Sequence, residues 1–275
     1  NQAAVLFFFS IDVSTSINSS YFCRLMANRY FIELAYDGTP FHGWQIQPNA
    51  KSIQESLNNT LSTILRSEIY VVGCGRTDTG VHAKLFYAHF DFNNEISDLD
   101  QLTYKCNRLL DPAIAIFRFF KVGEDAHTRF SAISRSYEYL ITQQKDPFAV
   151  NRKWEMREKL NVDRMNQAAA ALLEYKDFTS FSKSNTQTET NLCDVTEAYW
   201  TQNGNALNFR ITANRFLRNM VRAIVGTTIE VGQGRINTAD FKSIIEAKNR
   251  SEAGLSVPAH GLYLSNIVYP EGMIE

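Results

Sequence analysis

The stretch GCGRTDTGVHA, residues 73–83, combines a carboxylate and a guanidinium inside a glycine-rich turn. Its three glycines allow backbone angles that other residues avoid, and they flank Arg76 and Asp78. One interpretation is structural, with the Asp78 side chain capping backbone groups of a loop. The other is a catalytic carboxylate that a rigid loop presents beside a cation. This stretch alone leaves both interpretations open.

A second stretch that could do chemistry is the basic segment RFLRNMVRAIVG. The pattern predicts a helix over residues 215–231, and the spacing of Arg215, Arg218 and Arg222 would place the three on one face. Residues 198–229 contain no acidic side chain that could pair with them locally. Such a face suits phosphates or a buried carboxylate, although a solvated basic face is the common structural alternative.

The segment SRSYEY, residues 134–139, reads as a strand that carries Arg135, Tyr137 and Tyr139 on one face. A cation together with aromatic rings suits a nucleic-acid surface, because charge follows the backbone and rings stack on bases. A half-buried sheet with aromatic core residues explains the same pattern. By itself the segment does not choose between the two.

Motifs for metals and nucleotide cofactors are missing from the sequence. The histidines show no metal-ligand spacing, and we interpret all five as structural or RNA-adjacent: His42, His82, His89, His127 and His260. The four cysteines lie far apart without a CxxC pair, which is typical of reduced cytoplasmic thiols: Cys23, Cys74, Cys106 and Cys193. We therefore expect no metal and no nucleotide cofactor.

The composition is that of a globular protein with a sizeable core. The chain has 275 residues, of which 44% are hydrophobic, and its formal net charge is −1. This balance argues against coating nucleic acid through bulk charge, so a local cluster of arginines would have to provide any such contact. Residues 1–25 are expected to be an N-terminal extension outside the fold, and the sequence predicts no membrane span.

Strands and helices alternate in two similar runs, which predicts an α+β protein. In the first run we expect strands at 29–36, 83–92 and 114–122 and helices at 52–66 and 98–110. In the second run we expect strands at 135–142, 206–213 and 261–269 and helices at 162–175, 215–231 and 238–249. The boundary between the runs is expected near residues 123–134.

Taken together and in order, several segments resemble the tRNA pseudouridine synthase A family. The segments are YDGTPFHGWQIQ (36–47), GRTDTGVHA (75–83), RSYEYLI (135–141), DFTSF (177–181), MVRAIVGT (220–227) and PAHGLYL (258–264). The resemblance covers about residues 28–269, and GRTDTGVHA is its most specific element. It departs from the family at Thr79, where alanine is common, and at Ala223, where asparagine is common.

The resemblance implies a reaction and roles for residues. The family isomerises uridine to pseudouridine in tRNA at positions 38, 39 and 40, with neither cofactor nor metal. By analogy Asp78 is the nucleophile and Arg222 its cationic partner, while Arg76 enters the RNA and helps to extrude the target base. Tyr137 stacks on the uracil, and Leu262 packs on its other side.

The resemblance also implies a fold and partners. We expect two ferredoxin-like or RRM-like halves, 26–128 and 129–275, related by pseudo-twofold symmetry and joined into an extended, mostly antiparallel sheet with a central cleft. Arg135, Arg215 and Arg218 are expected to contact the RNA backbone. A cytoplasmic homodimer that clasps tRNA is expected, because bacterial members of the family are homodimers.

Two other function classes compete with this interpretation. A catalytically silent RNA-binding module could share the fold, although the intact Asp78, Tyr137 and Arg222 favour an enzyme. A glycoside hydrolase-like enzyme would use two carboxylates, and Asp78 has no obvious acidic partner. The sequence leaves open whether Asp78 attacks the uracil ring or the ribose carbon.

Overall fold

The computed structural model describes residues 28–183 and 190–274, so the expected extension at 1–25 lies outside the described residues. The first half contains β1 (Asn28–Tyr36), α2 (Ile53–Leu65), β2 (Val72–Gly73), β3 (His82–Phe92), α3 (Leu99–Leu109) and β4 (Ile114–Val122). The second half contains β5 (Ser134–Thr142), β6 (Trp154–Glu155), α4 (Val162–Ala171), β7 (Val195–Asn203), β8 (Ala206–Ala213), α5 (Met220–Gly232), α6 (Thr238–Glu246) and β9 (Leu262–Val268).

Within the described residues, one open sheet of nine strands connects the two halves. Its strand order is β4-β1-β3-β9-β5-β8-β7, with β2 added beside β3 and β6 beside β5. Neighbouring strands are antiparallel except for the pairs β3–β9 and β5–β6. The prediction of an α+β protein with a mostly antiparallel sheet is therefore confirmed.

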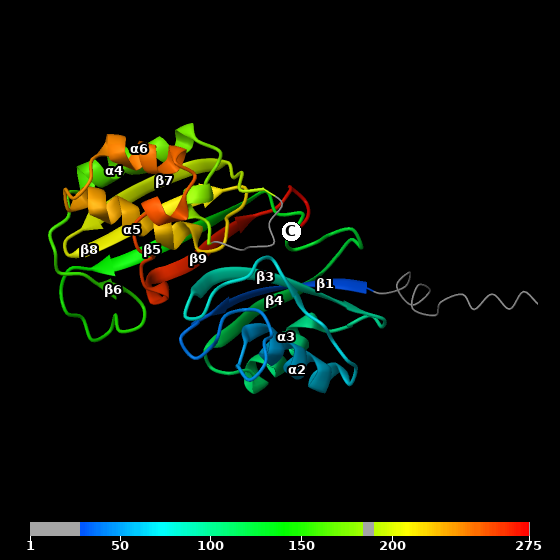
Figure 1. Cartoon of the computed structure of the whole chain (residues 1–275). Coiled ribbons are helices and arrows are strands. Elements are labelled where there is room, and N and C mark those ends of the chain that lie inside the picture. Colours follow the sequence, from blue (N-terminus) through cyan, green and yellow to red (C-terminus); the bar gives the residue numbers. More distant parts are fainter. Residues whose placement is uncertain (1–27, 184–189, 275) are drawn as a thin grey trace, which may run out of the picture.

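Helices cover the sheet in two separate groups (Figure 1). Helices α2 and α3 lie together against β1, β3 and β4, whereas α4, α5 and α6 lie together against the strands of the second half. Each group closes its own cluster of buried hydrophobic side chains. Tyr137 on β5 packs against both clusters, which places this ring at the junction of the halves.

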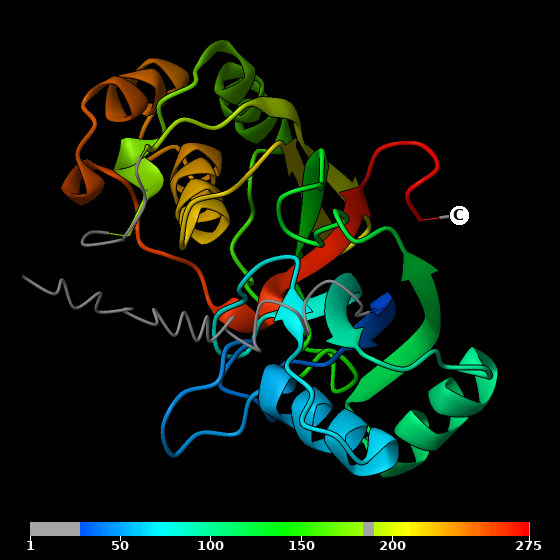
Figure 2. The ribbon, with the colours of Figure 1, turned by 90° about the vertical axis from the view of Figure 1, so that its right-hand side faces the viewer.

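The junction between the halves is a short parallel pairing. Residues His82 and Ala83 of β3 pair with Tyr263 and Leu264 of β9. Because parallel strands begin at the same edge of a sheet, the segments that lead into β3 and β9 must meet there. Figure 2 shows β9, in red, beginning beside the cyan segment that precedes β3. The pairing thus brings the glycine-rich turn next to residues from the end of the chain.

Local signals predicted the helix α2 well. The expected range was 52–66 and the observed one is Ile53–Leu65, with the Ser52 side chain accepting a hydrogen bond from the backbone N–H of Glu55. The helix ends at Arg66, which has a left-handed φ of 53°. Capping chemistry and apolar spacing act over one or two turns, so the sequence contains most of what sets these ends.

The prediction of a helix over 215–231 was wrong at its start. Helix α5 begins at Met220, after Asn219 in a left-handed conformation with a φ of 68°. Arg215 and Arg218 therefore precede the helix, and the three arginines do not share a helical face. The left-handed residue interrupts the helical hydrogen bonds. The spacing of the arginines, three and four positions apart, gives no sign of this interruption.

Strand β7 was missed in the sequence. It pairs with β8 through a short connection in which Gly204 has a φ of 57°. The signal that could have found it is the Asn203-Gly204 pair between two strand-like runs, a common sequence for tight hairpins.

Candidate active site

The turn that carries Asp78 is closed by its own backbone. The N–H of Val81 donates to the carbonyl oxygen of Asp78 at 3.1 Å, and Gly80 has a φ of 76°. A residue with a side chain would be strained at that position of the turn. The expectation that all three glycines have unusual angles was wrong, because Gly73 and Gly75 have no positive φ. Gly73 instead leaves room for Trp44, whose indole would lie 2.5 Å from an added Cβ.

The segment that follows β1 holds the residue just before Asp78. The hydroxyls of Tyr36 and Thr77 share a hydrogen bond of 2.9 Å in a buried setting. The N–H of Trp44 donates to the carbonyl oxygen of Thr77 at 3.1 Å. Gly43, with a φ of 90°, approaches so closely that an added Cβ would lie 2.5 Å from the same oxygen. The backbone position of Asp78 is therefore set by contacts across two segments.

Two guanidinium groups lie beside the Asp78 carboxylate, one at each oxygen. Arg222 Nη1 is 3.8 Å from Oδ2, and Arg218 Nε is 3.6 Å from Oδ1. Both distances are those of ion pairs without a direct hydrogen bond. The expected proximity of Arg222 and Asp78 is thus present. Arg218 differs from expectation, because it lies at the carboxylate and was expected only near RNA phosphates.

Arg222 is held in place by the segment before β9. Its Nε donates to the carbonyl oxygen of Val257 at 2.7 Å, and 21% of its side chain is exposed. Arg218 is 59% exposed, and Asp78 is 35% exposed. Sequence reasoning could not find Val257, because the contact uses a backbone carbonyl and any residue type supplies one.

Tyr137 and Leu262 lie on the same face of the sheet. Tyr137 is opposite Leu264 on β9, and Leu262 is opposite Tyr139, so the two are diagonal neighbours. Tyr137 also contacts the Phe216 ring edge-on, with a centroid distance of 5.0 Å. Burial raises the pKa of the Tyr137 hydroxyl, and the nearby Asp78 charge adds to this rise, so the ring stays neutral. Leu262 is only 6% exposed.

Arg135 does not present a free guanidinium to RNA, in contrast to our expectation. Its Nη1 donates to the carbonyl oxygens of Ala132 and Asn214 at 3.2 and 2.9 Å. Its Nη2 donates to the carbonyl oxygens of Arg129 and Cys74 at 2.5 and 3.5 Å. Contact with a phosphate would come at the expense of these bonds. The side chain ties the start of the glycine-rich turn to β5 and to the end of β8.

The other two arginines named from the sequence are available. Arg76 is exposed on the turn, two residues before Asp78, and Arg215 is half-buried before α5. Within residues 28–183 and 190–274, neither guanidinium has a hydrogen bond or an ion pair, and both are candidates for binding an anion.

His82 connects the segments that meet at this edge of the sheet. Burial lowers its pKa although the Asp37 charge opposes this, so the ring is neutral. Nε2–H then donates to the carbonyl oxygen of His260 at 3.1 Å, and Nδ1 accepts from the N–H of Gly38 at 3.1 Å. The ring stacks on Tyr263 with a centroid distance of 4.6 Å. The buried ring thus joins Gly38, His260 and Tyr263, which come from three different segments.

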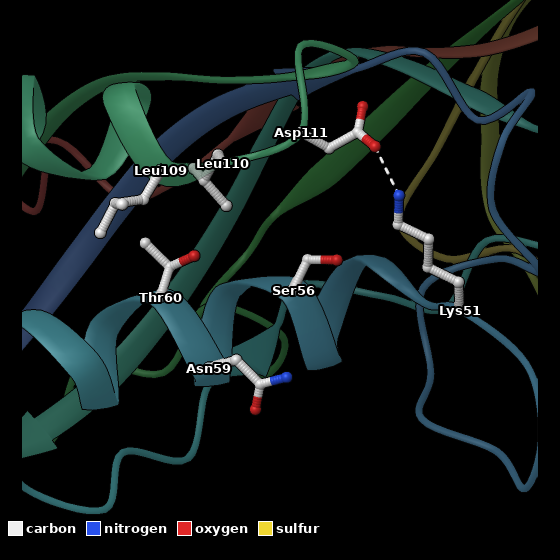
Figure 3. A pocket seen from close by; sticks show the side chains of 7 residues that line it. All are labelled: Lys51, Ser56, Asn59, Thr60, Leu109, Leu110 and Asp111. Carbon is white, nitrogen blue, oxygen red and sulfur yellow. Dashed lines mark hydrogen bonds and ion pairs between the residues drawn. The ribbon is translucent and has the colours of Figure 1, made fainter.

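A separate hollow lies between α2 and the end of α3 (Figure 3). Lys51 and Asp111 form an ion pair of 2.5 Å at its rim, and the remaining lining residues are Ser56, Asn59, Thr60, Leu109 and Leu110. The hydrogen bonds from Lys51 and from the N–H of Ala113 lower the pKa of Asp111. This carboxylate already has partners, and the hollow shares no residue with the cluster around Asp78.

The described part of the chain contains no group of three or more His, Cys, Asp or Glu side chains that could hold a metal ion. Cys74, Cys106 and Cys193 are buried and free, and Cys23 lies outside the described residues. No helix of the described part is long and apolar enough to span a membrane.

Comparison with known proteins identifies the chain's relatives. A family model described as tRNA pseudouridine synthase matches residues 168–270. A protein of Bacteroides fragilis named tRNA pseudouridine synthase A is 50% identical over 252 residues, covering 91% of this chain and 100% of that protein. Proteins of the same name from Porphyromonas gingivalis and Bacillus subtilis are 51% and 38% identical, covering 89% and 86% of this chain and 98% and 97% of those proteins. The chain therefore belongs to the tRNA pseudouridine synthase A family.

Proposed function

We propose that this protein isomerises uridine to pseudouridine in the anticodon arm of tRNA, at positions 38, 39 and 40, with Asp78 as the nucleophile. The observation that carries the proposal is the Asp78 carboxylate, held on a fixed turn with a guanidinium at each oxygen. The names of the relatives support the substrate class and the reaction.

The reaction requires few groups besides Asp78 and the two arginines beside it. The N1–C1′ bond breaks and a C5–C1′ bond forms, so N1 gains a proton and C5 loses one, and no water or electron is consumed. The nucleophile acts as a carboxylate, and the fixed guanidinium of Arg222 faces its negative charge. Attack at the uracil ring and attack at the ribose carbon are both compatible with this arrangement.

The surrounding residues have separate roles in the proposal. The target base is stacked inside the RNA and must be extruded, and the exposed Arg76 would take its place. Tyr137 would stack on the extruded uracil, and Leu262 would pack on its other side. Arg215 and Arg218 would bind phosphates, which suits a chain whose net charge of −1 provides no general attraction for RNA.

The proposal includes two ferredoxin-like halves, 26–128 and 129–275, related by pseudo-twofold symmetry around a central cleft. Its support is the strand order, which in the first half is β4-β1-β3-β2 and in the second half β9-β5-β8-β7. When the strands of each half are numbered in chain order, without the short β6, their order across the sheet is fourth, first, third, second in both halves. Two separate hydrophobic clusters support the same division.

We also propose a cytoplasmic homodimer. An asparagine side chain occupies the backbone groups in the middle of each outer strand of the sheet. Asn107 hydrogen-bonds the N–H and the carbonyl oxygen of Ile116 on β4. Asn166 hydrogen-bonds the N–H and the carbonyl oxygen of Trp200 on β7. Edges blocked in this way do not pair readily with another strand. The partner would therefore contact a face or a loop, and light scattering that shows a monomer at micromolar concentration would count against the dimer.

The decisive test is incubation of the purified protein with unmodified tRNA, followed by mapping of pseudouridine along the RNA. We expect pseudouridine at positions 38, 39 and 40. Binding of tRNA without any pseudouridine would instead identify a silent RNA-binding module.

A further inference from the structure

Arg218 and Arg222 hold the same carboxylate in different ways. Arg222 is largely covered, and its Nε is committed to the carbonyl oxygen of Val257 at 2.7 Å. Arg218 is 59% exposed, and Asp78 is the only partner that the described residues offer to its guanidinium. One cation is therefore anchored to the protein, and the other is free to leave.

A guanidinium lies beside each oxygen of the carboxylate: Arg218 Nε faces Oδ1, and Arg222 Nη1 faces Oδ2. A nucleotide that approaches one oxygen to bonding distance gains room there when the guanidinium beside that oxygen moves away. Moving Arg222 breaks the hydrogen bond to Val257, whereas moving Arg218 breaks no hydrogen bond, because its 3.6 Å contact is too long to be one.

We infer that tRNA binding transfers Arg218 from Asp78 to a phosphate near the target nucleotide and so uncovers Oδ1 for the reaction. This inference rests on the proposed function. A phosphate offers Arg218 two charge-assisted hydrogen bonds, whereas the exposed pair with Asp78 is weak.

Only the side chain of Arg218 has to move. Its carbonyl oxygen accepts a hydrogen bond from the N–H of Lys183 at 3.1 Å. The next residue, Asn219, is in the left-handed conformation and donates from its side chain to Ser256 Oγ at 2.6 Å. The backbone on both sides is therefore anchored, and rotation about the side-chain bonds is enough for the transfer.

The inference has a thermodynamic consequence that affinity measurements can detect. If the pair exists only in the free protein, RNA binding must break it, and the pair opposes binding. Asp78→Asn removes the pair and should tighten tRNA binding through Arg218. Exposed ion pairs contribute ~0.2–1 kcal/mol, which converts to a change in affinity of about 1.4-fold to 5-fold.

The test is a double-mutant cycle on the dissociation constant for unmodified tRNA, at one low salt concentration. The proteins are wild type, Asp78→Asn, Arg218→Met and the double variant, with thermal melts to show that each is folded. Any repulsion between Asp78 and RNA phosphates is present in both backgrounds and cancels in the cycle. A matched cycle uses Arg215→Met, which removes a nearby arginine that has no ion pair with Asp78.

We expect Asp78→Asn to tighten binding about threefold more in the Arg218 background than in the Arg218→Met background. In the Arg215 cycle, Asp78→Asn should change the affinity equally in both backgrounds, so the ratio of its two effects should be near one. A ratio near one in the Arg218 cycle, or a ratio in the opposite direction, would show that Arg218 keeps Asp78 in the complex and would overturn the inference. In that case the wild type still binds tRNA and forms pseudouridine, so the proposed function stands. A wild type that does not bind tRNA would overturn both.

Discussion

Val257 holds Arg222 from two directions. The Arg222 Nε donates to the Val257 carbonyl oxygen at 2.7 Å, and the Val257 N–H donates to the Arg222 carbonyl oxygen at 3.3 Å. The segment that leads into β9 is thereby fixed to the first turn of α5. Because β9 pairs with the start of β3, the same contacts fix the cation relative to the turn that carries Asp78. A two-way contact of this kind gives the guanidinium one position instead of several.

Asp78→Ala is expected to abolish pseudouridine formation while the protein stays folded, since the side chain is 35% exposed and contributes little to the core. Single-turnover assays on tRNA and thermal melts measure the two effects. Thr79→Ala, an exposed change on the same turn, should stay near wild-type activity. Activity of Asp78→Ala within about tenfold of wild type, a cost of only about 1.4 kcal/mol in barrier height, would end the nucleophile assignment.

Arg222→Met is expected to slow single turnover by about tenfold or more, because the fixed cation that faces the Asp78 carboxylate is lost. Arg222→Lys keeps the positive charge and should retain more of the single-turnover rate. Single-turnover assays and tRNA affinity measurements separate an effect on the reaction from an effect on binding. Loss of affinity alone, with an unchanged single-turnover rate, would mean that Arg222 is only part of an RNA-facing surface.

Tyr36→Phe is expected to lower kcat several-fold without changing the KM for tRNA, because the lost hydroxyl holds Thr77 and not the RNA. The free energy of unfolding should fall by about 1 kcal/mol for the lost hydrogen bond. Tyr30→Phe is the matched control: it removes a hydroxyl that accepts from the N–H of Ile96 at 2.9 Å, away from the site. Equal kinetics for the two variants would exclude a positioning role for Tyr36.

His89 is expected to make folding sensitive to acid. Burial, with further contributions from the Arg29 and His127 charges, lowers its pKa to about 4, from an ordinary value of about 6.5. Between these two pH values the His89 ring binds a proton in the unfolded chain but not in the folded protein. The free energy of unfolding therefore falls as the pH drops from about 6.5 towards 4. A shift of this size corresponds to about 3 kcal/mol.

Urea unfolding between pH 7 and pH 4 measures this effect. His89→Asn should flatten the decrease in stability, whereas His42→Asn, at an exposed histidine, should leave it unchanged. Equal slopes for wild type and His89→Asn would show that other groups cause the acid sensitivity.

Much of the candidate site could be predicted from the sequence. The resemblance of GRTDTGVHA and MVRAIVGT to family segments pointed to Asp78 and Arg222, and the structure brings these two side chains within 3.8 Å of each other. Helix α2 and the strands β1, β3 and β5 were also predicted. The ends of these elements depend on capping residues, turn residues and the alternation of apolar and polar residues within a few positions. Such local patterns can be recognised in the sequence.

The placement of the arginines was decided only by tertiary structure. Spacing predicted one helical face for Arg215, Arg218 and Arg222, but the left-handed Asn219 ends that regularity, and Arg218 lies at Asp78. Arg135 matched the pattern of an RNA contact, yet it donates to four backbone carbonyls. A guanidinium binds whichever acceptor the fold brings near, and several of these acceptors lie far away in sequence: Asp78 for Arg218, and Cys74 and Asn214 for Arg135. The parallel pairing of β3 with β9 places the Asp78 turn beside the segment before β9, and no local pattern encodes this long-range register.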